Sequence, residues 1–179
     1  MKPKVTLRNL NNLSSNEWAY IAGIVDGEGS IAIVASKSKK GTGLPSHYLR
    51  LYVGNTSENL IQYLHNRLGG YKGIYVDNSS PHPIYKYYLT GENAKRVLLK
   101  MKPYLIIKRE QADLGIYFQD HKVNRPTYKG WTNKQIEEEI SWRELIKEKI
   151  SVRNGLNVQE KLDKVRDLHR LSDETSHLR

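Results

Sequence analysis

Two acidic residues, Asp26 and Glu28, follow an apolar stretch that begins at Trp18, and glycines stand on both sides of Glu28. Carboxylate oxygens are ligands that Mg²⁺ accepts in proteins. A divalent ion held beside a phosphodiester can activate water and stabilise the leaving oxygen. Glu28 is therefore the first candidate metal ligand, and Asp26 is the second. The alternative from spacing alone is an ordinary core helix that ends at a glycine.

The residues around the two acids predict a short helix from about residue 15 to residue 28. Ser14 and Glu17 have the spacing of a capping box, in which each side chain accepts a hydrogen bond from the backbone of the other residue. Gly29 is well placed to end the helix. Because side chains two residues apart at a helix end point to different sides, Asp26 and Glu28 need not share a role.

Ala19, Gly23 and Gly27 recur every four residues and form a row with almost no side chain along this helix. Each interior glycine costs about 1 kcal/mol of helix propensity relative to alanine, so the row indicates close packing against another backbone. A second copy of the chain could be that partner, which places these three residues at a dimer interface. The pairing would bring a second Glu28 close to the first, and two carboxylates at helix C-termini call for a cation.

The chain is basic, with 29 lysines and arginines against 19 aspartates and glutamates. The net charge of +10 favours a polyanionic partner, and the excess lies in residues 1–125, which hold 18 basic and 9 acidic residues. No apolar run reaches the roughly 18 residues of a membrane span, so we expect a soluble, intracellular protein in a prokaryotic cytoplasm or an organelle. Because cysteine is absent, any metal must be held by oxygen or imidazole.

The rest of the chain must position these residues, and its pattern predicts two successive units of one helix and two strands. The predicted strands are 30–37, 48–54, 71–77 and 84–90, and the further helices are 58–68, 92–101 and 108–121. The order αββαββαα indicates an α+β fold, in which a four-stranded antiparallel sheet carries helices on one face. We expect Leu49, Leu51 and Val53 to face the core, and also Ile74 and Val76 on the second hairpin.

The sheet face opposite the helices combines tyrosines with basic residues, which suits contact with base edges and phosphates. A twisted β ribbon fits the major groove and presents alternate side chains to the bases. Lys37 and Lys40 are expected to contact phosphates. The other residues predicted to bind DNA are Ser36, Ser38, Lys39, Tyr48, Arg50, Tyr52, Tyr75, Asp77, Lys86 and Tyr88.

The segment Ile21–Gly29, Ile-Ala-Gly-Ile-Val-Asp-Gly-Glu-Gly, resembles the signature of the LAGLIDADG homing endonucleases. The resemblance implies the αββαββα fold of that family, with a saddle-shaped antiparallel sheet that binds double-stranded DNA. Because the chain holds one copy of the motif, a homodimer is implied. Its implied activity is a staggered double-strand cut in a long pseudo-palindromic site, with Mg²⁺ or Mn²⁺ as the cofactor.

The resemblance also implies the active-site residues. In the family the second acid of the signature binds the metal, often with the carbonyl of the residue before it, which points to Glu28 and Gly27. The family usually has aspartate there, and glutamate reaches one methylene farther. Lys108 resembles a lysine that follows a Pro-aromatic-Leu run and lines the active site, although it could be a surface lysine at a helix N-terminus. Asn55 resembles a polar residue that positions water, although it could be a plain helix cap.

Two other interpretations remain. A non-catalytic nucleic-acid-binding protein of the same fold, such as an RNA maturase or a DNA-binding regulator, would keep the basic face without needing both Glu28 and Lys108. The joint presence of these two residues favours the enzyme. An unrelated ferredoxin-like RNA binder would have the order βαββαβ and an aromatic signature on its strands, and the sequence shows neither.

The domain organisation predicted from the sequence is a core with an N-terminal arm at residues 1–125 and a helical extension of the same domain at residues 126–179. The extension begins its first helix at a second capping box, Thr132–Gln135. Charges of both signs are interspersed along it, which is typical of solvated helices that support a core or a dimer.

Overall fold

The computed structural model describes residues 6–35, 47–76 and 82–121, which belong to one compact unit, Met1–Asn124. The strands are β1 (Gly29–Ala35), β2 (His47–Asn55), β3 (Tyr71–Tyr75) and β4 (Ile84–Thr90). The α-helices are α1 (Ser15–Glu28), α2 (Glu58–Leu68), α3 (Gly91–Met101) and α4 (Arg109–His121), with short 3-10 turns η1 (Leu10–Asn12) and η2 (Lys102–Tyr104). The predicted order αββαββαα is confirmed.

Several predictions fall on residues outside this description. They concern the DNA-binding residues Ser36, Lys37, Ser38, Lys39, Lys40 and Asp77, and the helical extension at 126–179. The domain boundary at residue 125 likewise stays a prediction.

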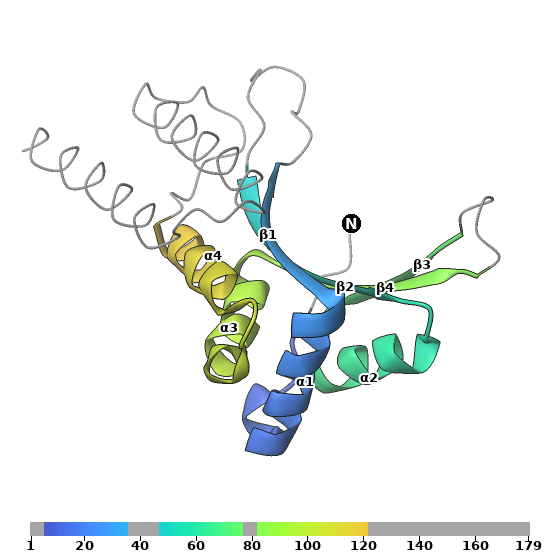
Figure 1. Ribbon diagram of the computed structural model, residues 1–179. Helices are drawn as coiled ribbons and strands as arrows, with labels where there is room; N and C mark the ends of the chain where they lie inside the picture. The colour runs from blue at the N-terminus through green and yellow to red at the C-terminus, as the bar shows by residue number, and fades with distance from the viewer. Residues whose placement is uncertain (1–5, 36–46, 77–81, 122–179) are drawn as a thin grey trace, which may run out of the picture. The chain divides into compact units, whose positions relative to one another are not determined.

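The four strands form one antiparallel sheet in the order β1-β2-β4-β3. Helices α1, α2, α3 and α4 lie on one side of this sheet, and none of them covers its other side (Figure 1). The predicted α+β fold with a sheet open on one face is confirmed for the residues described.

The core lies between the sheet and the helices. Leu49, Leu51 and Val53 alternate along β2 and are fully buried, as predicted. Helix α4 comes so close to β2 that a Cβ atom at Gly115 would lie 2.5 Å from Cδ1 of Leu49. A side chain at residue 115 would force the buried Leu49 to move, so glycine allows α4 to lie this close to the sheet.

The local signals around α1 also act as predicted. The amide of Ser14 donates to Oε2 of Glu17 at 3.0 Å, and the amide of Glu17 donates to Oγ of Ser14 at 3.3 Å. At the other end Gly29 donates its amide to the carbonyl of Val25. A Cβ atom at Gly29 would lie 2.7 Å from that carbonyl oxygen, so glycine allows β1 to leave the helix end directly.

The prediction for the inner face of the second hairpin was wrong. Ile74 and Val76 were expected in the core, but their side chains are 58% and 66% exposed. The hairpin of β3 and β4 extends beyond the helices that cover the rest of the sheet (Figure 1). Strand alternation predicts which face a side chain occupies, but it does not predict whether a helix covers that face.

Candidate active site

Asp26 joins the end of α1 to the segment that precedes α4. Oδ2 of its carboxylate accepts hydrogen bonds from the backbone amides of Ile106 at 2.8 Å and Ile107 at 3.2 Å, and Oδ1 accepts one from the amide of Lys108 at 2.9 Å. In return, Nζ of Lys108 donates to the backbone carbonyl of Asp26. The first acid of the motif therefore binds backbone amides with both of its oxygens.

These contacts decide the charge state of Asp26. Partial burial raises the pKa of its carboxyl group, but the three amide donors and the positive charge of Lys108 lower it by more. The net pKa lies below its usual value, so the carboxylate is ionised at neutral pH. The start of α4 adds a favourable field, because a helix N-terminus stabilises an anion.

The segment before α4 is anchored from its other side as well. Leu105 is fully buried, and Nε of Arg109 donates to its carbonyl at 3.1 Å. A second guanidinium nitrogen of Arg109 donates to the carbonyl of Pro103 at 3.0 Å. The amide of Ala112 donates to the carbonyl of Lys108 at 3.0 Å, which begins the hydrogen bonding of α4. Lys108 therefore lies between two anchored points of the chain.

Glu28 differs from Asp26 in its exposure and in its hydrogen bonds. It is the last residue of α1, its side chain is exposed, and within the described residues it makes no side-chain hydrogen bond or ion pair. Gly27 is also exposed, with no atom within 4 Å of the place where a Cβ would lie. The Glu28 carboxylate and the Gly27 carbonyl are hard oxygen donors, which fits a Mg²⁺ ion. The described part of one chain holds no group of three or more His, Asp or Glu that could complete such a site.

Asn55 ends β2 and takes part in the turn before α2. Its Oδ1 accepts from the amide of Ser57 at 2.8 Å. The N-cap of α2 is Ser57, whose Oγ accepts from the amide of Leu60 at 3.4 Å. The side-chain oxygen of Asn55 is thus used locally, and its nitrogen is the atom that could meet a water molecule.

The row of small residues on α1 lies on the exposed side of that helix. Ala19, Gly23 and Gly27 are all exposed, and apart from the adjoining backbone of α1 itself, no atom of the described residues lies within 4 Å of a Cβ built at either glycine. Ile106 and Ile107, held by the Asp26 carboxylate, are 88% and 69% exposed. Ala19, Gly23 and Gly27 of α1 and these two isoleucines are therefore apolar surface that the described residues leave exposed.

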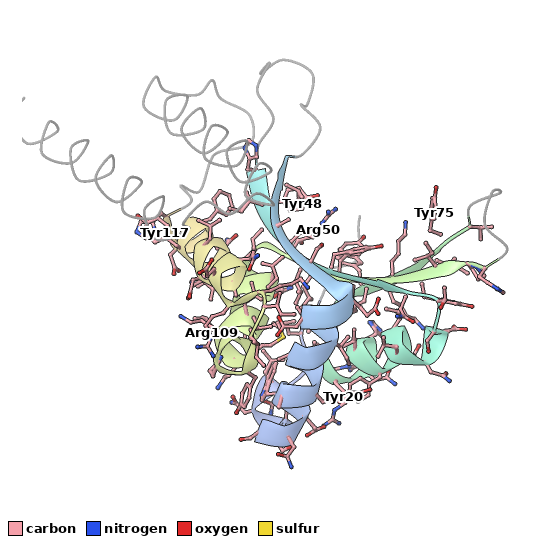
Figure 2. The ribbon with its side chains drawn as sticks, viewed as in Figure 1. Tyr20, Tyr48, Arg50, Tyr75, Arg109 and Tyr117 are labelled. Carbon is pink, nitrogen blue, oxygen red and sulfur yellow. The ribbon has the colours of Figure 1, made fainter. Side chains whose placement is uncertain are left out.

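The sheet face opposite the helices is rich in aromatic and basic side chains, as Tyr48, Arg50 and Tyr75 show in Figure 2. Tyr52, Tyr88 and Tyr71 occupy one row across β2, β4 and β3. The guanidinium of Arg50 lies 5.6 Å from the ring centre of Tyr52, and Nζ of Lys86 lies 3.9 Å from that of Tyr75. All six predicted DNA-binding residues that the structure describes thus lie on these strands, at positions expected for the open face.

Sequence reasoning missed Tyr71 on this face. Its ring stacks on Tyr88 with the ring centres 5.0 Å apart. Tyr71 lies four residues before Tyr75 in the same strand, and residues an even number apart share a face. This spacing could have identified Tyr71.

Comparisons with known proteins agree with this geometry. A family model described as LAGLIDADG endonuclease matches residues 21–119. The homing endonuclease I-CvuI, solved with the I-CreI target in the presence of Mg and with the DNA not cleaved, is 19% identical with a TM-score of 0.58, covering 83% of this chain and 94% of that chain. A structure of I-CvuI with its own target in the presence of Ca gives the same values.

An archaeal intron-encoded homing endonuclease complexed with DNA is 13% identical with a TM-score of 0.44, covering 72% of this chain and 97% of that chain. None of the curated proteins matches the chain. Among the helices of the described ranges, none has the length and apolar character needed to cross a membrane. The family model spans more than half of the sequence and the fold is that of I-CvuI, so this chain belongs to the LAGLIDADG endonuclease family.

Proposed function

We propose that this chain is a homing endonuclease that cuts both strands of a long pseudo-palindromic DNA site as a homodimer, with Mg²⁺ or Mn²⁺ as its cofactor. The observation that carries the proposal is the different surroundings of the two motif acids. Asp26 is occupied by three amide donors, whereas Glu28 is exposed at the helix end with its carboxylate available. An exposed acid at this place in a LAGLIDADG chain is suited to a metal at a phosphodiester.

Glu28 and the carbonyl of Gly27 would hold the metal in this proposal. A bound divalent ion supplies Lewis-acid stabilisation of the phosphate and a more acidic water. Because Glu28 and Gly27 offer one carboxylate and one carbonyl in one chain, the remaining ligands would be phosphate oxygens, water and the second copy's carboxylate. Two negative charges from a pair of Glu28 side chains would favour the cation over an empty site.

Lys108 would contribute a positive charge at the same helix end. Its ammonium already lies at the carbonyl of Asp26, two residues before Glu28. There it can stabilise charge on the phosphate or orient a water molecule. Asn55 would place a second polar group from the end of β2. The two residues would act on water and phosphate, and Glu28 on the metal.

The open face of the sheet would bind the DNA. Tyr48, Arg50, Tyr52, Tyr75, Lys86 and Tyr88 would reach base edges and phosphates, with Ser36, Lys37, Ser38, Lys39, Lys40 and Asp77 extending the contact. Tyr71 joins this set because it stacks on Tyr88. The cation–π pairs of Arg50 and Lys86 hold these two cations over the sheet, where phosphates can be approached. I-CvuI, which shares the fold, was solved in complex with DNA targets, and this supports DNA as the partner of the present chain.

The homodimer rests on the uncovered face of α1. Ala19, Gly23 and Gly27 leave room for a helix backbone, and nothing in the described part of the chain fills that room. The exposed Ile106 and Ile107 add apolar surface beside the motif acid Asp26 that binds their amides. Covering these residues with a second copy would remove their apolar surface from water.

The test is cleavage of a supercoiled plasmid library with randomised duplex inserts by the full chain in Mg²⁺, Ca²⁺ or EDTA. We expect linear products with staggered ends and a recurring, nearly palindromic insert in Mg²⁺, and uncut plasmid in EDTA. A Glu28→Gln chain that cut the selected site at the normal rate would overturn the proposal. Binding of structured RNA without cleavage of any DNA in the library would instead support the maturase interpretation.

A further inference from the structure

We propose that Asp26 is a positioning residue for Lys108, so that the first acid of the motif acts on the reaction through this lysine and not as a metal ligand. The inference rests on the proposed function in one respect, because it takes Lys108 to assist DNA cleavage. The contact itself is a property of the folded chain and does not depend on that function.

The contact holds Lys108 at both ends. Its backbone amide donates to Oδ1 of Asp26 at 2.9 Å, and its ammonium donates to the carbonyl of Asp26. Lysine has a long flexible stem, so a single contact would leave its ammonium free to occupy many positions. Two contacts to one residue close a ring through the side chain of Lys108 and restrict where the ammonium can lie.

Apolar packing does not hold the two residues directly before Lys108. Ile106 and Ile107 have their side chains largely in solvent, although their backbone amides point at Asp26. The nearest buried residues of the segment are Leu105 before it and Ala112 after it. The carboxylate of Asp26 therefore holds the backbone of residues 106–108, while Arg109 holds the carbonyls of Pro103 and Leu105, and the carboxylate contact sets the position of the Lys108 backbone.

The same hydrogen bonds make Asp26 a poor metal ligand. Oδ2 accepts from two amides and Oδ1 from a third, so both oxygens already face positively polarised hydrogens. A cation would have to displace these donors or share their acceptors. Glu28 has no such partners among the described residues, which separates the roles of the two acids.

The first test needs neither metal nor DNA. Amide hydrogen exchange at residues 106–108 and acetylation of Lys108 by an amine reagent, followed by mass spectrometry, are compared in the wild type, Asp26→Asn and the matched control Asp113→Asn. Asp113 lies in α4, pairs with Lys102 and is outside the site. We expect Asp26→Asn to speed both reactions by roughly 10-fold at these residues alone, because asparagine offers one neutral acceptor oxygen where the carboxylate offers two charged ones, so that amides of residues 106–108 lose their partner. Unchanged exchange and labelling rates in Asp26→Asn would overturn the proposal that Asp26 positions Lys108.

The second test is a double-mutant cycle of single-turnover cleavage on the selected site. Asp26→Asn is expected to slow cleavage by about 10- to 100-fold, as small misplacements of a catalytic group do, while DNA affinity in Ca²⁺ stays within about 2-fold. In a Lys108→Met chain the same change should have no further effect. An equal loss in both backgrounds, or recovery of Asp26→Asn in excess Mn²⁺, would overturn the positioning role. If the wild type cuts no DNA, the proposed function fails. The exchange and acetylation rates still show whether Asp26 positions Lys108.

Discussion

Helix α1 has two faces that differ in what they contact. The face toward the sheet and the other helices is buried within the chain, and it consists of Trp18, Ile21, Ala22 and Val25. The opposite face carries Ala19, Gly23 and Gly27, which contact nothing there in the described residues. The helix also ends in one bound acid, Asp26, and one exposed acid, Glu28.

Contacts within one chain explain the residues on the buried face of α1, but they do not explain the small residues on its exposed face. Large apolar side chains on the buried face stabilise the fold by about 1.5–3 kcal/mol each. The two glycines on the other face cost about 1 kcal/mol each in helix propensity, and no contact in the described part of the chain offsets this. The exposed face therefore makes physical sense when a second copy packs on it. The buried face contributes to stability, and in the proposed function the exposed face serves assembly and metal binding.

The largest effect on cleavage should come from Glu28, at the exposed C-terminal end of α1. Glu28→Gln is expected to lower the single-turnover cleavage rate by about 1,000-fold, or about 4 kcal/mol, because the neutral amide binds a divalent cation poorly. DNA affinity and thermal stability should change little. Glu28→Asp is the matched control, because it keeps the charge and is the residue usual in the family, and it should retain cleavage. Loss of cleavage in Glu28→Asp alone would show that the extra methylene is required.

A substitution on the buried face should affect stability instead. Ile21→Ala removes a fully buried side chain and is expected to cost about 2–5 kcal/mol in the free energy of unfolding. Urea unfolding of the full chain measures this cost. A loss below about 1 kcal/mol would mean that the face toward the core is less tightly packed than the structure shows.

Gly23→Ala should raise the stability of the protomer and weaken its self-association. A Cβ atom at this position meets no atom within 4 Å, so alanine should stabilise the isolated protomer by about 1 kcal/mol through helix propensity. The same methyl group should weaken self-association, which sedimentation at several concentrations measures. Ala22→Gly on the buried face is the control, expected to lower stability by about 1 kcal/mol with self-association unchanged. Stronger association of Gly23→Ala would contradict the dimer face.

The smallest effect concerns the start of α1. The backbone amide of Ser14 lowers the pKa of Glu17, slight burial opposes it, and Arg67 adds to the lowering, so the pKa lies below its ordinary 4.5. A group whose folded pKa is depressed contributes stability above its unfolded pKa and loses it as the pH falls through the folded pKa. The melting temperature of Glu17→Gln should therefore lie below that of the wild type at pH 7, and the gap should close in acid. A gap that persists at low pH would contradict this origin.

Much of the fold could be predicted because its signals are local. The capping box of Ser14 and Glu17 and the alternation along β2 each depend on residues close in sequence. The contacts of Asp26 with residues 106–108 could not be predicted, because they join segments about 80 positions apart and depend on how α4 packs on the sheet. The exposure of Ile74 and Val76 was missed for the same reason, since it depends on where the helices end beneath the hairpin.

The candidate site divides in a similar way. The motif identified Asp26 and Glu28, and the segment around Lys108 identified the lysine. The sequence placed Glu28 before Asp26 as the metal ligand and noted that the two acids need not share a role, but it gave Asp26 no other role, whereas the hydrogen bonds show its partners. Only tertiary packing reveals which acid is occupied, because both have the same chemistry and lie in the same turn of the helix.

The most direct measurement of the central claim is the molar mass of the full chain by light scattering, without DNA and with duplex DNA carrying the selected site. The account predicts a protein mass of twice the 20.7 kDa of one chain, and a shift toward one chain in Gly23→Leu, whose side chain would fill the exposed face of α1. A wild-type protein mass of one chain at every concentration, with and without DNA, would contradict it.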